Sequence, residues 1–269
     1  MALSVTKASH RTLAYLTYLA KGTSIHKVHP PFAFGFYSNV LKQKIPAEKE
    51  KTLDQIRNKG LKNKNIIEHT DMGSRSGKKP YLTTFKSVGK IVKDTSISKK
   101  YGTVLFNLVR YYQPLQVLEF GTAAGISTLY MALAKQNEAR LITMEGCSET
   151  ATVARSNFKK THNNDIEVLT GEFDALLPLA TKMMPQIDMV YIDGNHTKNA
   201  TISYFNALLE HVHNNSIIVL DDIHWSEEMT EAWKEIIQNS EITLSIDLFK
   251  IGIVFFKKDL SKQHMILRY

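Results

Sequence analysis

A short stretch near the middle of the chain combines an acidic side chain with several small residues. Glu119 lies near the end of an apolar run, residues 116–120, and the turn that follows contains Gly121, Ala123 and Gly125 before a pattern of helical spacing begins. This order predicts a strand, a tight turn and a helix. Small residues let a ligand approach the backbone, and the N–H groups at the start of the helix can face that ligand.

The residues of this turn argue against a phosphate ligand. A Walker loop needs Gly-Lys-Ser/Thr at its end, which is absent, and the dinucleotide pattern needs a third Gly or Ala where Thr128 stands. Glu119 would repel a pyrophosphate, but its carboxylate can accept a hydrogen bond from an ammonium group. The turn therefore favours a zwitterionic ligand, and a strand, turn and helix without any ligand is the alternative.

This stretch resembles the first motif of class I S-adenosylmethionine-dependent methyltransferases. In that family an acidic strand end and a small-residue loop hold the methionine part of the cofactor, so the resemblance implies S-adenosylmethionine as the cofactor. The residues expected to bind it are Glu119, Gly121, Thr122, Ala123, Gly125, Ser127, Glu145, Glu172, Phe173 and Asp193.

The ends of the next two predicted strands carry groups suited to the rest of this cofactor. Glu145 follows Glu119 by 26 residues, one strand–helix–strand unit, and a carboxylate there can accept from two ribose hydroxyls. Glu172 and Phe173 follow the third strand, where one can accept from the adenine amine and the other can cover the ring. A core role for Phe173 is the alternative.

Three carboxylates follow the fourth and fifth predicted strands. Asp193 ends the fourth strand, and Asp221 and Asp222 end the fifth. Because neighbouring parallel strands end at one edge of a sheet, these side chains can converge. Three carboxylates would repel one another without a cation, and a hard divalent ion such as Mg²⁺ prefers oxygen ligands. The alternative has no metal, with Asp193 as a cofactor ligand and Asp222 as a turn cap.

The spacing of these aspartates resembles the metal-dependent O-methyltransferases related to catechol O-methyltransferase and the bacterial sugar O-methyltransferases. The resemblance implies that Asp193, Asp221 and Asp222 are metal ligands. His196, three residues after Asp193, is the expected proton acceptor for the substrate hydroxyl, with Asp193 as its catalytic partner, and His224 is the second candidate. The loops 193–196 and 221–225 contain no lysine, which departs from the catechol enzyme.

Strands and helices alternate along the C-terminal two thirds of the chain, as in a parallel sheet covered by helices. The predicted fold is α/β, a Rossmann-like, seven-stranded methyltransferase sheet with a terminal antiparallel hairpin and an N-terminal helical extension. The predicted strands are residues 116–120, 140–144, 166–170, 187–192, 216–220, 242–249 and 251–257. The predicted helices of this region are residues 99–112, 148–160, 174–183, 197–213 and 227–238.

Residues 1–98 are expected to form a basic, mainly helical extension, and residues 99–269 the S-adenosylmethionine-binding domain. The helices expected in the extension cover residues 11–20, 47–58 and 83–94. The aromatic residues between Phe32 and Tyr37 are expected to dock the extension on the main body, although they could also stack on a base. The polar, basic loop at residues 69–80 is expected to lie near the active site as a lid.

Composition restricts the class of protein further. The 269 residues are 43% hydrophobic, enough for a sizeable core, and no apolar run reaches the roughly 20 residues that span a bilayer. The N-terminus lacks the apolar segment of a secretory signal, and a single cysteine, Cys147, excludes an intrachain disulfide. The sequence therefore predicts a cytoplasmic protein that does not bind membranes.

The chain has a net charge of +8, and its positive charge lies in the N-terminal part. Residues 1–100 hold 20 Lys and Arg against 6 Asp and Glu, so the remaining residues are acidic on balance. Such an excess is usual for a solvated face, but it also suits an RNA backbone. The predicted function is therefore O-methylation of a small-molecule or sugar hydroxyl with S-adenosylmethionine and a divalent metal, with RNA methylation as the alternative. A cofactor-binding protein without transfer activity is a third possibility. The acceptor and the oligomeric state stay open.

Overall fold

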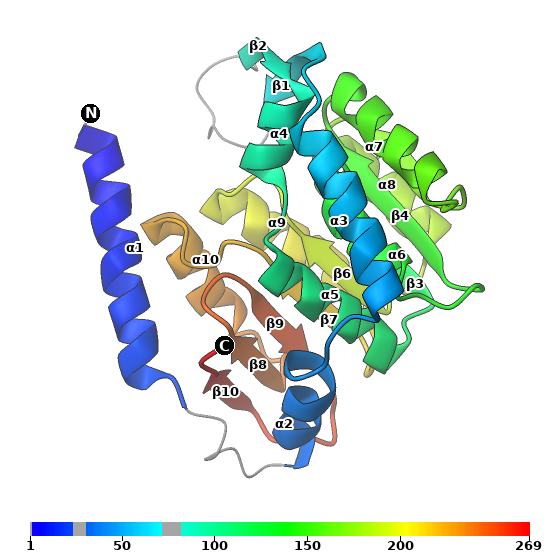
Figure 1. Cartoon of the computed structure of the whole chain (residues 1–269). Helices are drawn as coiled ribbons and strands as arrows, with labels where there is room; N and C mark the ends of the chain where they lie inside the picture. Colours follow the sequence, from blue (N-terminus) through cyan, green and yellow to red (C-terminus); the bar gives the residue numbers. More distant parts are fainter. Residues whose placement is uncertain (1, 24–30, 72–81) are drawn as a thin grey trace. The chain divides into compact units, whose positions relative to one another are not determined.

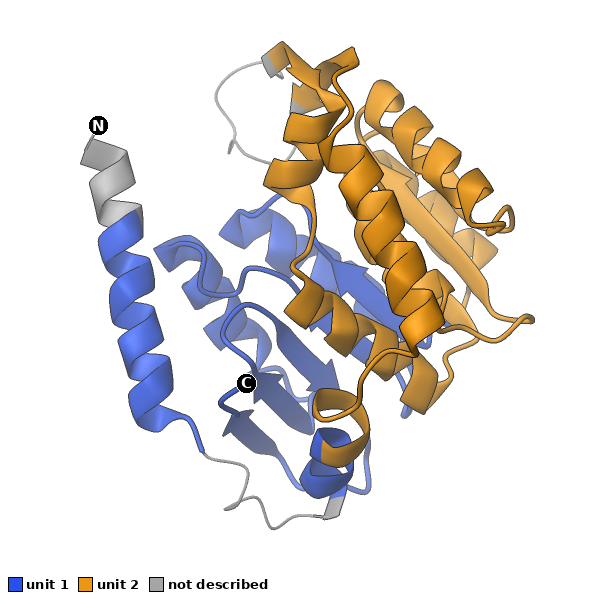
Figure 2. Cartoon of the chain, in the orientation of Figure 1, with its two compact units in different colours: residues 1–37, 186–269 blue, residues 38–185 orange. Residues whose placement is uncertain are grey.

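The computed structural model describes residues 2–23, 31–71 and 82–269 of the chain (Figure 1). The chain groups into two compact parts (Figure 2). Residues 38–185 form one of them, the central part, and residues 1–37 together with 186–269 form the other, the terminal part.

Three parallel strands form the sheet of the central part. They are β3 (Gln116–Phe120), β4 (Arg140–Glu145) and β5 (Glu167–Thr170), neighbours in that order. The register pairs Phe120 with Met144 and Glu145 with Thr170, so all three strands end at one edge. The interiors of β3 and β4 are buried, as their almost continuous apolar sequences predict for a parallel sheet.

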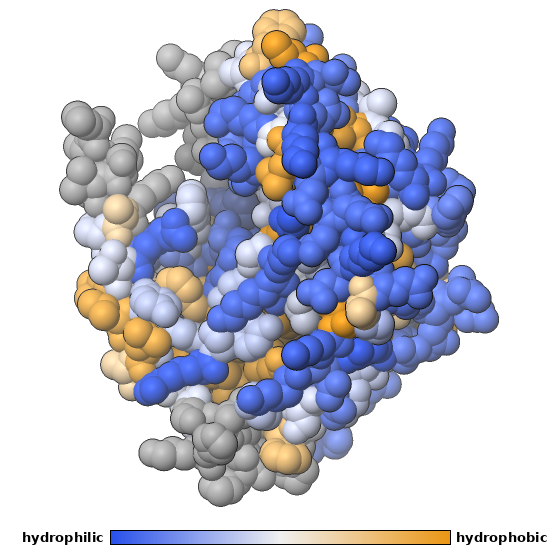
Figure 3. All heavy atoms as spheres, in the orientation of Figure 1, coloured by the Kyte–Doolittle hydropathy of each residue, from blue (hydrophilic) through white to orange (hydrophobic). Residues whose placement is uncertain are grey.

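The helices of the central part are α3 (Ala47–Leu61), α4 (Val88–Thr95), α5 (Lys99–Tyr112), α6 (Ile126–Ala132), α7 (Ser148–Lys160) and α8 (Phe173–Met183). Helices α7 and α8 pack against β4, and α5 packs against α6. Leu53 and Ile56 are the buried apolar residues of α3, and hydrophilic side chains cover its outer face (Figure 3). This confirms the charged helix expected over residues 47–58.

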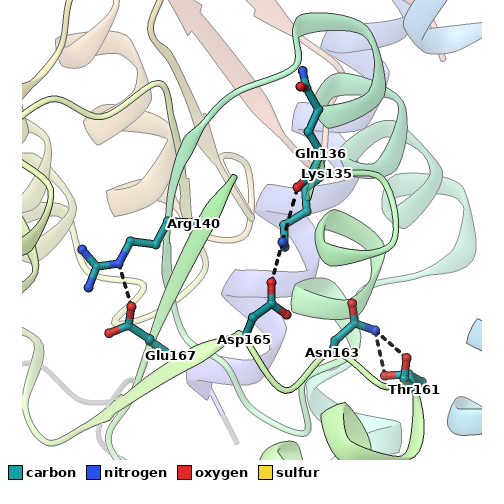
Figure 4. Close-up of polar contacts among 7 residues, drawn as sticks. All are labelled: Lys135, Gln136, Arg140, Thr161, Asn163, Asp165 and Glu167. Carbon is teal, nitrogen blue, oxygen red and sulfur yellow. Dashed lines mark hydrogen bonds and ion pairs between the residues drawn. The ribbon is translucent and has the colours of Figure 1, made fainter. Parts of the chain in front are cut away.

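Two ion pairs lie at the amino ends of β4 and β5 (Figure 4). The Arg140 Nε is 2.6 Å from Glu167 Oε1, and the Lys135 Nζ is 2.6 Å from Asp165 Oδ2. They join the segments that enter the two strands, at the end of the sheet opposite Glu145. The charged groups at the amino ends are therefore already paired, whereas a ligand site is expected at the carboxyl ends.

The terminal part contains a mixed sheet of five strands in the order β10-β8-β9-β7-β6. β6 and β7 are parallel, β9 is antiparallel to both β7 and β8, and β10 is parallel to β8. The strands are β6 (Met189–Ile192), β7 (Ile217–Leu220), β8 (Leu244–Asp247), β9 (Gly252–Phe255) and β10 (Gln263–Ile266). The helices are α1 (Ala2–Lys21), α2 (Pro31–Phe36), α9 (Lys198–Leu208), the 3-10 helix η3 (Leu209–His211) and α10 (Glu227–Ile236), and the π-helix η2 (Tyr37–Leu41) follows α2 directly.

The α/β class, the mainly parallel sheet and the terminal antiparallel hairpin of β8 and β9 are confirmed. Seven strands were expected, and this number is wrong by one. Among the described residues, the sheet of the central part has three strands and that of the terminal part has five. The additional strand is β10, which is only four residues long, and half of its residues are exposed. Such a short strand has little apolar periodicity from which to predict it.

The helix expected over residues 83–94 is correct only for its second half, which is α4 (Val88–Thr95). β2 (Leu82–Ser87) occupies its first half and pairs in antiparallel fashion with β1 (Ile66–Asp71), a strand that was not predicted from the sequence. The Ser87 Oγ then accepts from the Lys90 N–H and caps α4. Residues 72–81, which include most of the expected lid loop, lie outside the described residues.

The N-terminal helix contacts loop and C-terminal residues of the terminal part. The Tyr18 hydroxyl donates to the Leu267 carbonyl, and Arg11 lies over the Trp225 ring at 4.5 Å. The Phe32 and Phe36 rings meet Phe255 of β9 edge-on at 5.1 and 6.2 Å, so the aromatic segment docks as expected. None of the described helices is both long and apolar enough to cross a bilayer.

Candidate active site

The turn between β3 and α6 is built from residues with left-handed backbone. Gly121, Ala123 and Gly125 have φ angles of 90°, 46° and 80°. The Gly121 N–H donates to the Met144 carbonyl, which ties the turn to the end of β4. A Cβ atom on Gly125 would lie 2.5 Å from the Phe158 ring, so only glycine lets α6 start this close to α7.

Glu119 of β3 is fully buried beneath this turn. Its Oε2 accepts from the Thr128 hydroxyl at 2.5 Å and the Thr143 hydroxyl at 2.7 Å, whereas its Oε1 is buried and has no hydrogen-bond partner among the described residues. Burial raises the pKa of Glu119 to about 7, although hydrogen bonds from Ser127 and the two threonines oppose the increase. An unpartnered buried carboxylate oxygen fits an ammonium group of a ligand.

Glu145 ends β4 and holds the turn from the other side. Its Oε2 accepts from the Ala123 N–H at 2.8 Å and its Oε1 from the Cys147 N–H at 2.9 Å. Burial raises the pKa of Glu145, and these backbone hydrogen bonds oppose the increase. Each carboxylate oxygen retains a lone pair, so the residue can accept from two further hydroxyl groups.

The remaining cofactor candidates of the central part differ in what they contact. The Thr122 hydroxyl is buried against that of Thr143 at 2.6 Å, and Ser127 is a hydrogen-bond partner of Glu119, so both side chains support the carboxylate. Glu172 is exposed just before α8. Phe173 is half-buried, and its ring meets Phe120 edge-on at 5.6 Å, so it belongs partly to the core.

In the terminal part, Asp193, Asp221 and Asp222 lie together and form what we call the acidic cluster. The register pairs Ile192 with Leu220, so the residues that follow β6 and β7 are neighbours. Burial first, and then the neighbouring carboxylates, raise the pKa values of Asp193 and Asp221. The convergence expected from the strand ends is therefore present.

Lys250 supplies a positive charge to the acidic cluster. Its Nζ is 2.9 Å from Asp221 Oδ2 and 3.0 Å from Asp222 Oδ1. Burial alone would lower the pKa of Lys250, but the three aspartates raise it. Lys250 was not predicted from the sequence, because it lies outside the two loops that follow the parallel strands. The pairing of Gly252 with Leu220 places the β8–β9 turn beside the end of β7, and an antiparallel hairpin in that position was the available signal.

The acidic cluster does not fit the expected divalent ion in this arrangement. Among the described residues, no three carboxylate, imidazole or thiol groups are placed to hold a metal ion together. The ammonium of Lys250 instead takes one oxygen of each member of the Asp221–Asp222 pair, and Mg²⁺ on their other oxygens would lie next to this positive charge.

Of the two histidines expected as proton acceptors, only His196 lies at the acidic cluster. Its Nε2 is 3.6 Å from Asp193 Oδ1, and its side chain is partly exposed. His224 has partners on both ring nitrogens, Asp247 Oδ2 at 2.8 Å and Thr230 Oγ1 at 3.2 Å. Both ring nitrogens of His224 are already engaged by side chains of the terminal part, so His196 is the better candidate.

Comparison with known proteins finds similarity to methyltransferases. A family model described as a methyltransferase domain matches residues 118–223. The catechol O-methyltransferase of Niastella koreensis is 32% identical over 130 residues, which cover 48% of this chain and 58% of the relative. The catechol O-methyltransferase of Mycobacterium tuberculosis is 30% identical over 129 residues, which cover 48% of this chain and 57% of that protein. The chain thus spans less than two thirds of the length of either relative.

Solved structures show the same fold at lower sequence identity. An O-methyltransferase from Bacillus cereus in complex with S-adenosylhomocysteine has a TM-score of 0.55 at 20% identity, covering 82% of this chain and 96% of that one. A methyltransferase of Podospora anserina bound to S-adenosylhomocysteine has a TM-score of 0.58 at 15% identity, covering 86% and 99%. Residues 118–223 thus resemble a methyltransferase domain in sequence, and the chain shares its fold with methyltransferases that bind S-adenosylhomocysteine.

Proposed function

We propose that the protein transfers a methyl group from S-adenosylmethionine to a hydroxyl group of a small molecule. The observation that carries this proposal is the buried Oε1 of Glu119, which has no hydrogen-bond partner in the part of the chain that the structure describes and lies below a turn of left-handed residues. That oxygen fits the amino group of the cofactor, and no Walker lysine is present to suit a nucleotide phosphate instead. The relatives that are named as catechol O-methyltransferases support oxygen as the acceptor atom.

The central part provides the proposed cofactor contacts. Glu119 accepts from the amino group, Glu145 accepts from the ribose hydroxyls, and Glu172 and Phe173 face the adenine. When bound, the cofactor supplies an electrophilic methyl group on a sulfonium. We also propose that residues 99–269 are the cofactor-binding domain and residues 1–98 an extension to it.

In methyl transfer the new O–C bond forms as the C–S bond breaks. The hydroxyl oxygen then carries three bonds, so its proton must leave for the product to be a neutral ether. We assign the uptake of this proton to the His196 imidazole. Asp193, at 3.6 Å, orients the ring and stabilises its charged form. Asp193 is held in turn by the Tyr191 hydroxyl, which donates to its Oδ2 at 3.2 Å. We assign no step to a divalent ion, because Lys250 already donates to both members of the Asp221–Asp222 pair and offsets one of their negative charges.

The experiment is methyl transfer from S-[methyl-¹⁴C]adenosylmethionine to panels of catechols, sugars and total RNA, with and without excess EDTA. The proposal expects labelled product from a small-molecule hydroxyl, and the sugar class expected from the sequence is one arm of the panel. If only RNA is labelled, the acceptor is RNA and the proposed small-molecule acceptor is wrong. A protein that does not bind S-adenosylhomocysteine at millimolar concentration would refute the proposal.

A further inference from the structure

The Lys250 ammonium lies where the strand-end aspartates would be expected to hold a metal ion. It bridges Asp221, whose side chain is 2% exposed, and Asp222, whose side chain is 23% exposed, and each of its two hydrogen bonds is about 3 Å long. Charge-assisted hydrogen bonds of this kind are stronger than those between neutral groups. The acidic pair therefore receives one positive charge from the chain's own residue.

The backbone around Lys250 holds the ammonium in this position. The Lys250 carbonyl accepts from the Ile223 N–H at 3.2 Å, so the β8–β9 turn is tied to the loop that carries both aspartates. Phe249, the residue before, has a φ angle of 72°. Its ring packs against Tyr15 at 4.9 Å and against Tyr18 at 5.4 Å. A lysine that follows such an anchored residue loses less conformational freedom on pairing than a lysine in a free loop.

The backbone of the loop that carries the aspartates places both carboxylates within hydrogen-bond distance of Lys250. The Asp221 N–H donates to the Ile192 carbonyl, which continues the pairing of β7 with β6 by one residue. Asp222 then adopts a φ angle of 52°, a left-handed conformation that is unfavourable for a residue with a Cβ atom. The hydrogen bond from Lys250 to its Oδ1 offsets this cost.

An ammonium and a divalent ion make incompatible demands on the same carboxylates. Mg²⁺ takes oxygen ligands at about 2.0–2.1 Å in an octahedral shell. Lys250 occupies one oxygen of each aspartate, and an ion on the remaining oxygens would lie beside the ammonium charge; among those oxygens is Asp221 Oδ1, which is buried and has no hydrogen-bond partner among the described residues. We propose that Lys250 takes the place of the divalent ion at the acidic cluster, and that the protein binds no divalent ion there while this lysine is present.

This inference concerns the acidic cluster of the proposed function, but it is tested by ion binding alone. The test needs no methyl acceptor and is run with and without S-adenosylhomocysteine. It can therefore fail while methyl transfer holds, and it can succeed in a protein that transfers no methyl group.

The experiment measures Mn²⁺ binding to EDTA-treated protein by electron paramagnetic resonance, and Mg²⁺ binding by calorimetry. The variants are Lys250→Met, which removes the charge and retains the chain length, and Lys250→Arg, which retains the charge. Lys198→Met is the matched control, because Lys198 pairs with Glu231 and Glu235 elsewhere in the terminal part. Circular dichroism checks the fold of each variant, and Lys250→Gln replaces the methionine variant if that one does not fold.

We expect no stoichiometric ion in wild type, Lys250→Arg or Lys198→Met at submillimolar concentration. The neutral variant should gain one ion per chain, with at least about tenfold tighter binding than wild type, and adding Asp222→Asn should remove that ion. Two results would overturn the inference. One is stoichiometric binding to wild type that Asp222→Asn abolishes, and the other is a folded neutral variant that gains no ion.

Discussion

Replacing Glu119 by glutamine should remove a pH dependence of cofactor binding. The carboxyl of Glu119 has a pKa raised to about 7 by burial, against an ordinary value of 4.5. A ligand ammonium favours the ionised form, of which about 9% is present at pH 6 and about 76% at pH 7.5. If only the ionised form binds, S-adenosylhomocysteine should bind about eightfold more tightly at pH 7.5 than at pH 6, equivalent to about 1.2 kcal/mol.

The same group should contribute to the pH dependence of stability with a defined sign. Because the folded pKa is raised, the contribution is fully present below pH 4.5 and is lost as the pH rises toward 7. The difference between the two pKa values corresponds to about 3 kcal/mol in the free energy of unfolding. Glu119→Gln has no ionisable group at this position and should lose both dependences.

Calorimetry of S-adenosylhomocysteine binding between pH 6 and 7.5 measures the affinity, and buffers of different ionisation enthalpy count the protons released. Urea unfolding over pH 4.5–7 measures the stability. Glu167→Gln is the control, because it removes a carboxylate at the amino end of β5 and should leave both dependences in place. A wild-type affinity that does not change with pH, or a Glu119→Gln variant that keeps the wild-type dependence, would refute the reasoning.

Three further predictions follow from the site. Glu145→Ala should weaken binding of S-adenosylhomocysteine by about 1–3 kcal/mol in calorimetry, because charge-assisted hydrogen bonds to the ribose are lost; an unchanged affinity would contradict the assigned role. His196→Ala should lower the methyl transfer rate by about 10²–10⁴-fold with cofactor affinity unchanged, whereas His224→Ala should mainly lower the melting temperature, since it breaks the bond to Asp247. Gly125→Ala should lower the free energy of unfolding by about 1–3 kcal/mol, because the new Cβ meets Phe158 in a left-handed residue; a thermal melt equal to wild type would disprove the packing argument.

Much of the fold and half of the candidate site are accessible from local sequence. Glu119 and Glu145 were predictable because each ends an apolar run and one strand–helix–strand unit separates them. Asp193 and Asp221 were predictable for the same reason, since parallel strands end at one edge of a sheet. These inferences need only periodicity and the direction of the strands.

The features that were missed depend on pairing between segments. Lys250 reaches Asp221 only because β9 runs antiparallel to β7, and no local pattern identifies the lysine as a partner of an acidic cluster. Residues 82–87 form a strand because they pair with residues 66–71. Without that partner, their sequence is equally compatible with the first turns of a helix that continues into α4. The structural role of His224 likewise comes from Asp247, which is 23 positions away.

The decisive experiment is a crystal structure of the protein with S-adenosylhomocysteine. We expect the amino group of the ligand within hydrogen-bond distance of Glu119 Oε1 and the ribose hydroxyls on Glu145. A ligand that binds elsewhere, or one that does not contact Glu119 Oε1, would refute the proposed cofactor site.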